Sequence, residues 1–305
     1  MSKSGIFTSS IAKKYWMALT GLFLITFLIG HLLGNLQLIT KTGEEGRRAF
    51  NEYAYFMGHN IFIKILAYAT YISILAHAFL GLYLAVKNKQ ARPKNYAYNK
   101  PSANSGAASR YMAILGTIIL VFICTHMANF WYKQKVAETV PLHYVEVKKV
   151  QQGQDPMTGQ PVTQEYTEIQ ALTTMGVYFP IGYINPQTNE KEIQIKPEGT
   201  KFKDPQSGLV AAEGYRDLHT VVMNFFGQSE QGQPTNQYAL IAVILYVVSM
   251  FVLMFHLWHG FASSFQSLGL NHRKYNGLIS FVGKAFAIVV PLLFAIIPVI
   301  IYLRK

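Results

Sequence analysis

The sequence predicts an all-α membrane protein, a bundle of five transmembrane helices with a small β-hairpin-rich insertion. Half of the residues are hydrophobic (51%) and only 14% are charged, against about 25% in soluble domains. The apolar residues also gather in five runs, and each is long enough to cross a bilayer, which takes about 20 residues. These runs are Tyr15–Ile39, Ile61–Val86, Tyr111–Trp131, Tyr238–Phe265 and Phe281–Leu303.

The basic residues of the short loops predict how the helices cross the membrane. They gather in the N-terminal segment, in the loop Lys87–Arg110 and in the pair Arg273–Lys274, which alternating spans place on one side. The opposite short loop, residues 40–60, mixes basic with acidic residues. Since Lys and Arg accumulate on the cytoplasmic side, we expect a cytoplasmic N-terminus and a periplasmic C-terminus. Topology then explains the net charge of +12, which requires no nucleic acid partner.

Residues 133–236 are polar and divide the chain into 1–132, 133–236 and 237–305. Asp/Asn-Pro turn motifs recur at Asp155–Gly159, Asn185–Asn189 and Asp204–Gly208, with alternating strand patterns beside them. We expect a β-hairpin cap over about Pro141–Ala212 at the outer end of the bundle. Tyr215–Phe226 has the pattern of an amphipathic helix on the outer surface. His143 and His219 fall in this region, where we interpret them as solvated surface residues.

Four histidines lie deep inside apolar runs: His31, His77, His126 and His256. A polar or ionisable side chain in a bilayer core is costly, so each of these positions indicates a functional site. His31 and His126 lie about 15 residues along runs that lead outward, whereas His77 and His256 lie at least as far along runs that lead inward. The histidines therefore sort into an outer pair and an inner pair, about 12 Å apart along the membrane normal.

Two layers of paired histidines are typical of two bis-histidine haems between helices. Cys124 is the only cysteine, so the C-x-x-C-H of covalent haem and the ligands of an iron–sulfur cluster are absent. Non-covalent haem b fits best. Small residues near the ligands, Gly30 and Gly34 beside His31, Gly81 after His77 and Gly260 after His256, would make room for the rings. The plain alternative is that each histidine hydrogen-bonds a neighbouring helix.

His259 is a rival to His256 as the fourth ligand, because the two share roughly one helix face. We favour His256, since His-x-x-x-Gly then repeats the arrangement of His77 and Gly81. His259 lies nearer the inner end, where it would meet a haem propionate or a quinone.

Several stretches resemble the cytochrome b subunit of succinate:quinone oxidoreductase and fumarate reductase, in its single-subunit, five-helix, di-haem form common in Bacteroidetes-like bacteria. The resemblance covers all five spans and their short loops, whereas the insertion of about Pro141–Ala212 is longer than the family usually carries. The matching stretches are Gly30–Gln37, His77–Tyr83 with Ala91–Pro93, His256–Phe261 and Phe265–Asn271.

The resemblance implies that His31 and His126 bind the iron of a distal haem, and His77 and His256 that of a proximal haem. It implies a respiratory complex of the tricarboxylic acid cycle in a bacterial inner membrane. The soluble partners on the cytoplasmic face would be a flavoprotein (FAD) that handles succinate and an iron–sulfur protein. The basic loop Lys87–Arg110, Arg273–Lys274 and Gln266–Asn271 are where we expect them to dock, although positive-inside topology alone would also explain the basic loop.

The electrons would pass to or from a membrane quinone, whose site needs a titratable group and hydrogen-bond donors. Outer candidates are Gln37, Glu52 and His59; inner candidates are Ser263, Ser264, His259 and Arg92. Menaquinone-type members of the family imply the distal side, which favours Glu52 as the proton-handling group, with a solvated loop carboxylate as the alternative. No catalytic residue is expected in this chain alone.

Other functions remain open at this point. The cytochrome b subunit of a hydrogenase or formate dehydrogenase would also use membrane histidines and quinone. A proton-coupled transporter or a purely structural anchor would bind no haem.

Overall fold

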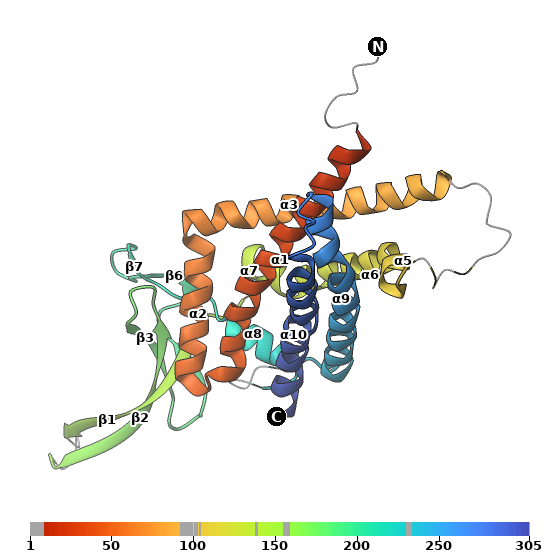
Figure 1. Cartoon of the computed structure of the whole chain (residues 1–305). Helices are drawn as coiled ribbons and strands as arrows, with labels where there is room; N and C mark the ends of the chain where they lie inside the picture. Colours follow the sequence, from red (N-terminus) through yellow and green to blue (C-terminus); the bar gives the residue numbers. More distant parts are fainter. Residues whose placement is uncertain are drawn as a thin grey trace. The chain divides into compact units, whose positions relative to one another are not determined.

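The computed structural model describes residues 9–91, 100, 103, 105–137, 140–154, 159–229 and 234–304. These residues form two compact units (Figure 1). The first contains the long helices and takes in the described residues up to Thr40, His59–Asn129 and those from Met223 onward. The second is formed by Lys41–Gly58 and Phe130–Val222.

The five predicted spans are confirmed as helices. Among the described residues, five helices are long and apolar enough to cross a membrane, which is compatible with a multi-pass membrane protein. Their bounds are α1 (Ser10–Thr40), α3 (Ile61–Gln90), α6 with its continuation (Met112–Lys135), α9 (Ala239–Ser267) and α10 (Asn276–Leu303). A short helix, α5 (Ala107–Arg110), precedes α6.

The third span is not α-helical throughout. After α6 (Met112–His126) the chain makes one π-helical segment, η1 (Met127–Trp131), and ends in α7 (Tyr132–Lys135). Short π-helical segments are rare and often mark functional sites. This one begins at the residue that follows His126.

Most side chains of the long helices face outward, as a bilayer environment requires. On α3 only Thr70 is buried, while Phe62, Tyr68 and Phe79 are more than two-thirds exposed. Asn60 begins this helix, since its side-chain oxygen accepts hydrogen bonds from the amides of Phe62 and Ile63. A helix that satisfies its own backbone groups can carry such apolar surface into lipid.

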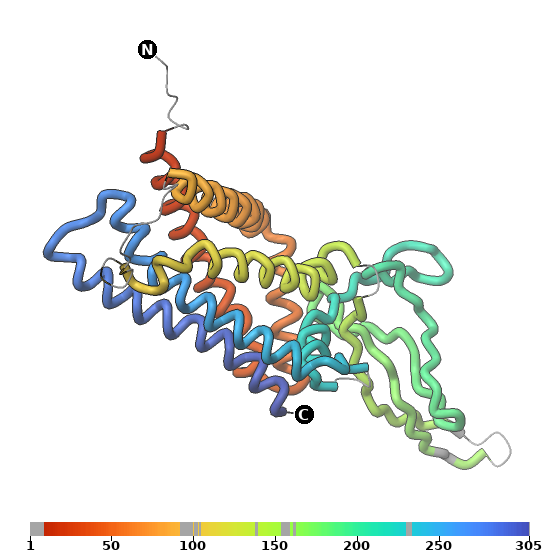
Figure 2. Tube along the Cα trace, turned by 90° about the vertical axis from the view of Figure 1, so that its right-hand side faces the viewer, coloured from red at the N-terminus to blue at the C-terminus, as the bar shows by residue number. Residues whose placement is uncertain are grey.

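The bundle is held by α1 and α9. Helix α1 packs on α3, α9 and α10, and α9 packs on α6 and α10. Figures 1 and 2 both show α9 and α10 running side by side. The buried side chains of Ile25, Leu257 and Ala287 form the centre of the contact among α1, α9 and α10.

Residues 43–59, expected as part of a short loop, instead form a helix, α2 (Gly43–His59). Its residues suit the helix dipole, because Glu44 and Glu45 lie in the first turn and His59 lies in the last. Its buried face carries Gly46, Arg47, Phe50 and Asn51, so half of that face is polar. The loop interpretation was wrong because those polar residues do not produce an apolar helical period.

The predicted β-rich insertion is confirmed. An antiparallel sheet with strand order β1-β2-β3-β4 contains β1 (Tyr144–Gln154), β2 (Pro161–Leu172), β3 (Tyr178–Ile184) and β4 (Lys191–Ile193). A smaller sheet contains β5 (Pro197–Glu198), β6 (Lys201–Lys203) and β7 (Val210–Glu213). The buried residues Leu142, Ile169, Ile181 and Phe202 form the core of this unit.

Two of the three predicted turns have the expected chemistry. The Asn185 side chain accepts from the Gln187 amide at 2.9 Å, and Asn189 has a positive φ of 56°. The Asp204 carboxylate accepts from the amides of Gln206 and Ser207, and Gly208 has a φ of 68°. Of the third motif, Asp155–Gly159, all but the glycine lies outside the described residues.

The predicted surface helix is shorter than expected, α8 (Leu218–Phe225). The interpretation of His143 and His219 as solvated residues was wrong. His143 has no exposed surface and His219 is only 3% exposed. Both side chains lie within the second unit, where the His143 ring meets Asn51 and Glu44 and the His219 ring packs against Phe50.

Candidate functional site

The four intramembrane histidines lie in the two pairs that their depths predicted. The rings of His31 and His126 have centroids 5.8 Å apart and an interplanar angle of 86°. The rings of His77 and His256 have centroids 6.2 Å apart and an angle of 68°. Each pair joins two helices, α1 with α6 and α3 with α9.

Both spacings fit two imidazoles on opposite sides of one metal ion. Metal–imidazole bonds of about 2 Å place the two ring centroids roughly 6 Å apart. Among the described residues no group of three or more His, Cys, Asp or Glu side chains is placed to hold a metal ion. A haem needs only two protein ligands, because the porphyrin supplies the other four. The residues present therefore fit haem iron better than a bare metal ion.

In the inner pair, Thr20 orients His77. The Thr20 hydroxyl donates to the Trp16 carbonyl at 2.7 Å, and its oxygen lies 3.2 Å from Nδ1 of His77. A hydroxyl has a single proton to give, and we assign it to the shorter Trp16 contact, so that the oxygen accepts from His77. Nδ1 therefore carries the ring proton, and Nε2 keeps the lone pair that a metal would use.

Glycines from neighbouring helices make room beside the inner rings. A Cβ atom on Gly21 of α1 would lie 3.2 Å from Cε1 of His77, and one on Gly116 of α6 would lie 3.6 Å from Cε1 of His256. The glycines that were predicted to make room for the rings lie on the same helices as the histidines, and their surroundings differ. Gly30 and Gly260 face open space, and a Cβ on Gly81 would meet only Met17.

Aromatic rings surround the outer pair. Phe27 stacks on His31 at 5.4 Å, and Phe294 lies 5.6 Å from the same ring. Phe122 and Tyr246 lie 5.6 Å and 6.0 Å from the ring of His126. These rings supply a mainly apolar wall at the outer site.

A short polar contact adjoins this wall. The side chain of Asn129, within the π-helical segment, donates to the Tyr246 hydroxyl at 3.1 Å. The segment thus joins α9 to the stretch just after His126. This π-helical segment directly follows His126, and it is the clearest irregularity of helix geometry next to a candidate ligand.

The ring contact with His77 belongs to His256 and not to His259. His259 is partly exposed, three residues nearer the helix end, and no ring contact joins it to His77 among the described residues. Of the other inner candidates, Ser264 is buried, and its hydroxyl donates to the Gly260 carbonyl at 2.8 Å. Arg92 lies outside the described residues.

The three outer quinone candidates are divided between the two units. Gln37 and His59 belong to the first unit, where the Gln37 amide donates to the Gly34 carbonyl and His59 is exposed. Glu52 belongs to the second unit and forms an ion pair with Arg48 at 2.8 Å. Glu52 is thus a residue of α2 and not of a loop, and its partly exposed carboxylate is paired with Arg48.

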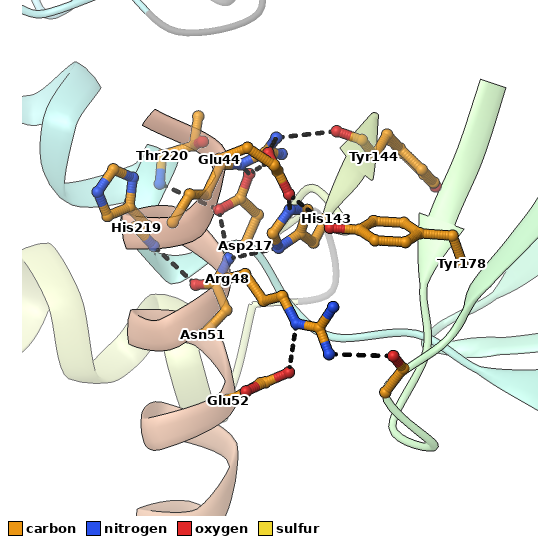
Figure 3. Close-up of polar contacts among 12 residues, drawn as sticks. Glu44, Arg48, Asn51, Glu52, His143, Tyr144, Tyr178, Asp217, His219 and Thr220 are labelled. Atoms are coloured by element: carbon orange, nitrogen blue, oxygen red, sulfur yellow. Dashed lines mark hydrogen bonds and ion pairs between the residues drawn. The ribbon is translucent and has the colours of Figure 1, made fainter. Parts of the chain in front are cut away.

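The second unit contains a polar cluster that sequence reasoning missed, and all of its members except Glu44 are buried (Figure 3). We define it as Glu44, Arg47, Asn51, His143 and Asp217. Arg47 donates to Asp217 through Nε at 2.9 Å and through Nη2 at 2.5 Å. The side chains of this pair are 6% and 1% exposed.

Asn51 connects the members of the polar cluster. Its amide nitrogen donates to Asp217 at 2.8 Å and to Nδ1 of His143 at 3.1 Å, while its oxygen accepts from the His219 amide. Because Nδ1 of His143 accepts, its proton lies on Nε2, which donates to Glu44 at 2.5 Å. Every polar atom of Asn51 is therefore used.

Charge and hydrogen bonding keep both acids of the polar cluster ionised. Burial raises the pKa of Asp217, but hydrogen bonds from Arg47, its charge, and bonds from Thr220 and Asn51 outweigh burial and lower that pKa. Burial likewise raises the pKa of Glu44, and His143, Tyr178 and Arg47 lower it by more. We therefore interpret the polar cluster as a structural element that holds α2 to the sheet region.

No protein-family model, curated protein or solved structure with which the chain was compared matches it. The family resemblance therefore rests on the sequence stretches alone.

Proposed function

We propose that this chain is the membrane cytochrome b subunit of a succinate:quinone oxidoreductase. In this proposal it carries two b haems, one held by His31 and His126 and one by His77 and His256. The observation that supports it best is the presence of two histidine pairs in one apolar bundle, with ring centroids 5.8 Å and 6.2 Å apart. Unrelated histidines that merely hydrogen-bond their neighbours have no reason to meet in pairs.

The residues of the chain would hold and orient the cofactors. Haem b, when bound, supplies a one-electron carrier whose potential depends on its ligands, their hydrogen bonds and burial. Thr20 fixes the His77 ring, and Phe27 and Phe294 enclose the His31 ring. The apolar helices exclude water from both places.

The remaining parts of the proposal follow from topology and resemblance. A flavoprotein and an iron–sulfur protein would dock on the cytoplasmic face of a bacterial inner membrane, at the side that carries Arg273 and Lys274. The quinone, menaquinone in this reading, would react near the distal haem, with Gln37, Glu52 and His59 as candidates.

A pyridine haemochrome assay on the purified full chain tests the proposal directly. We expect two haems b per polypeptide. His31→Ala and His126→Ala should each remove one spectral component, and His77→Ala and His256→Ala should each remove the other. A colourless protein would overturn the proposal, as a transporter or a structural anchor predicts.

Two further variants sharpen this experiment. His272→Ala changes an exposed loop histidine and should leave both components in place, as a matched control. His259→Ala should also keep both, whereas loss of the inner component would make His259 the ligand. Loss of the same component from the His31 and His77 variants would contradict the pairing. Subunits that co-purify distinguish a succinate dehydrogenase from a hydrogenase or formate dehydrogenase.

A further inference from the structure

Thr20 is a buried hydroxyl in the apolar part of α1. It is 9% exposed, and its oxygen lies 3.2 Å from Nδ1 of His77 on the neighbouring helix α3. Serine and threonine in such helices commonly bond only to a carbonyl of their own helix. Thr20 does this toward Trp16 and also reaches a second helix.

The direction of the hydrogen bond is set by the Trp16 contact. The Thr20 proton lies toward the backbone carbonyls of Trp16 at 2.7 Å and Met17 at 3.2 Å. The oxygen is therefore an acceptor for the Nδ1 proton of His77. The ring is thereby held on its Nδ1 edge, and Nε2 takes no part in this contact.

His256, the other histidine of the inner pair, has no such hydrogen bond. Nδ1 of His256 is buried and has no hydrogen-bond partner among the described residues. In the outer pair, Nδ1 of His31 has a longer contact of 3.4 Å, to a donor, the Asn35 side-chain nitrogen. An acceptor on the ring N–H is therefore specific to His77 among these three rings.

We infer that Thr20 is a positioning residue that tunes the inner haem through His77. An acceptor on Nδ1–H fixes the tautomer and makes the other nitrogen a more basic ligand. A more basic ligand stabilises ferric over ferrous iron, so Thr20 lowers the reduction potential of the inner haem relative to a chain without it. This inference rests on the proposed function, because it requires that His77 is a haem ligand.

The test compares Thr20→Val with Thr20→Ser in the full-length purified protein. Valine has nearly the shape of threonine without the hydroxyl, and serine keeps the hydroxyl. Thr26→Val is the matched control, since Thr26 lies on the same helix and bonds only to the Phe23 carbonyl, at 2.7 Å. Redox titration followed at both spectral components gives the potential of each haem.

We expect Thr20→Val to shift the inner component to a more positive potential and to leave the outer one unchanged. The shift should correspond to about twofold to tenfold in the reduction equilibrium, at most about 59 mV. Thr20→Ser should restore the original value, and Thr26→Val should match the unchanged protein. A purely structural role would not move one potential selectively.

The outcomes separate this inference from the proposed function. No haem in the unchanged protein overturns both. Two haems with an unmoved inner potential in Thr20→Val overturn the inference alone. If Thr20→Val loses the inner haem, the serine variant decides: retention at the original potential supports the inference, and loss of the haem there too overturns it.

Discussion

The Arg47–Asp217 pair should be the strongest single contact in the second unit. Asp217→Asn keeps the shape of the side chain and the oxygen that accepts from Asn51 and Thr220. It replaces the other oxygen, 2.5 Å from Arg47, by an N–H group that faces a donor. The guanidinium then stays buried with only two of its partners, the Tyr144 carbonyl at 2.8 Å and Glu44 at 3.3 Å.

Removal of one partner from a buried ion pair costs about 3–5 kcal/mol. The two remaining contacts of Arg47 place the expected cost at the lower end, about 3 kcal/mol. Such a change raises the opening equilibrium of the unit roughly 150-fold.

Hydrogen exchange of the intact protein measures this directly. Amide exchange in β2 and β3, read by mass spectrometry, should accelerate roughly 150-fold in Asp217→Asn, while amides of α9 and α10 keep their rates. Glu52→Gln is the matched control, since it breaks a pair on the same helix whose side chains are 38% exposed. It should cost less than about 1 kcal/mol. Equal effects of the two variants would refute the reasoning from burial.

Two further predictions concern pH and the inner rings. The folded pKa values of Asp217 and Glu44 are lowered, so their stabilisation is present above the unfolded values near pH 4 and is lost as the pH falls through the folded ones. The opening equilibrium of β2 and β3, given by their amide exchange relative to the intrinsic exchange rate at each pH, should therefore rise below about pH 4. Asp217→Asn should flatten this dependence, and an acid response as steep in that variant would contradict the assignment. Gly21→Ala should displace the His77 ring by a few tenths of an ångström and alter the inner haem spectrum. Gly277→Ala, at an exposed glycine in the first turn of α10 that faces open space, should alter neither haem. Low-temperature absorption spectra of both variants check this, and equal spectra would count against Gly21 as a spacer.

The apolar elements could be predicted because each carries a strong local signal. Five long runs can only be buried or lie in lipid, and their bounds followed within a few residues. The turns at Asn185–Asn189 and Asp204–Gly208 could also be predicted, since their side chains bond to the backbone two and three residues away. Such interactions are readable from adjacent letters in the sequence.

The polar cluster could not be predicted in the same way. Arg47 and Asp217 are far apart in the chain, and each by itself looks like an ordinary surface charge. Their burial depends on partners from α2, the segment before β1 and the start of α8. The error over His143 and His219 has the same cause, because the contacts that bury them, Asn51 and Glu44 at His143 and Phe50 at His219, come from distant parts of the chain.

The glycines beside the rings of the inner pair could not be predicted for a related reason. Gly30, Gly81 and Gly260 were chosen because they are near a histidine in sequence, on the same helix. The glycines that touch the rings, Gly21 and Gly116, come from other helices. Which helix faces which is a property of packing, and no spacing within one run contains it.

Helix α1 serves both histidine pairs, which is a consequence of its period. Thr20 and His31 are about three turns apart and nearly in line on one face, separated by roughly 16 Å along the axis. One contacts His77 of the inner pair, and the other lies against His126 of the outer pair. Because α1 is also anchored on α9 and α10 through Ile25 between these levels, a rotation of α1 would displace both contacts together. The two sites are therefore mechanically joined by one rigid element, although each has its own pair of histidines.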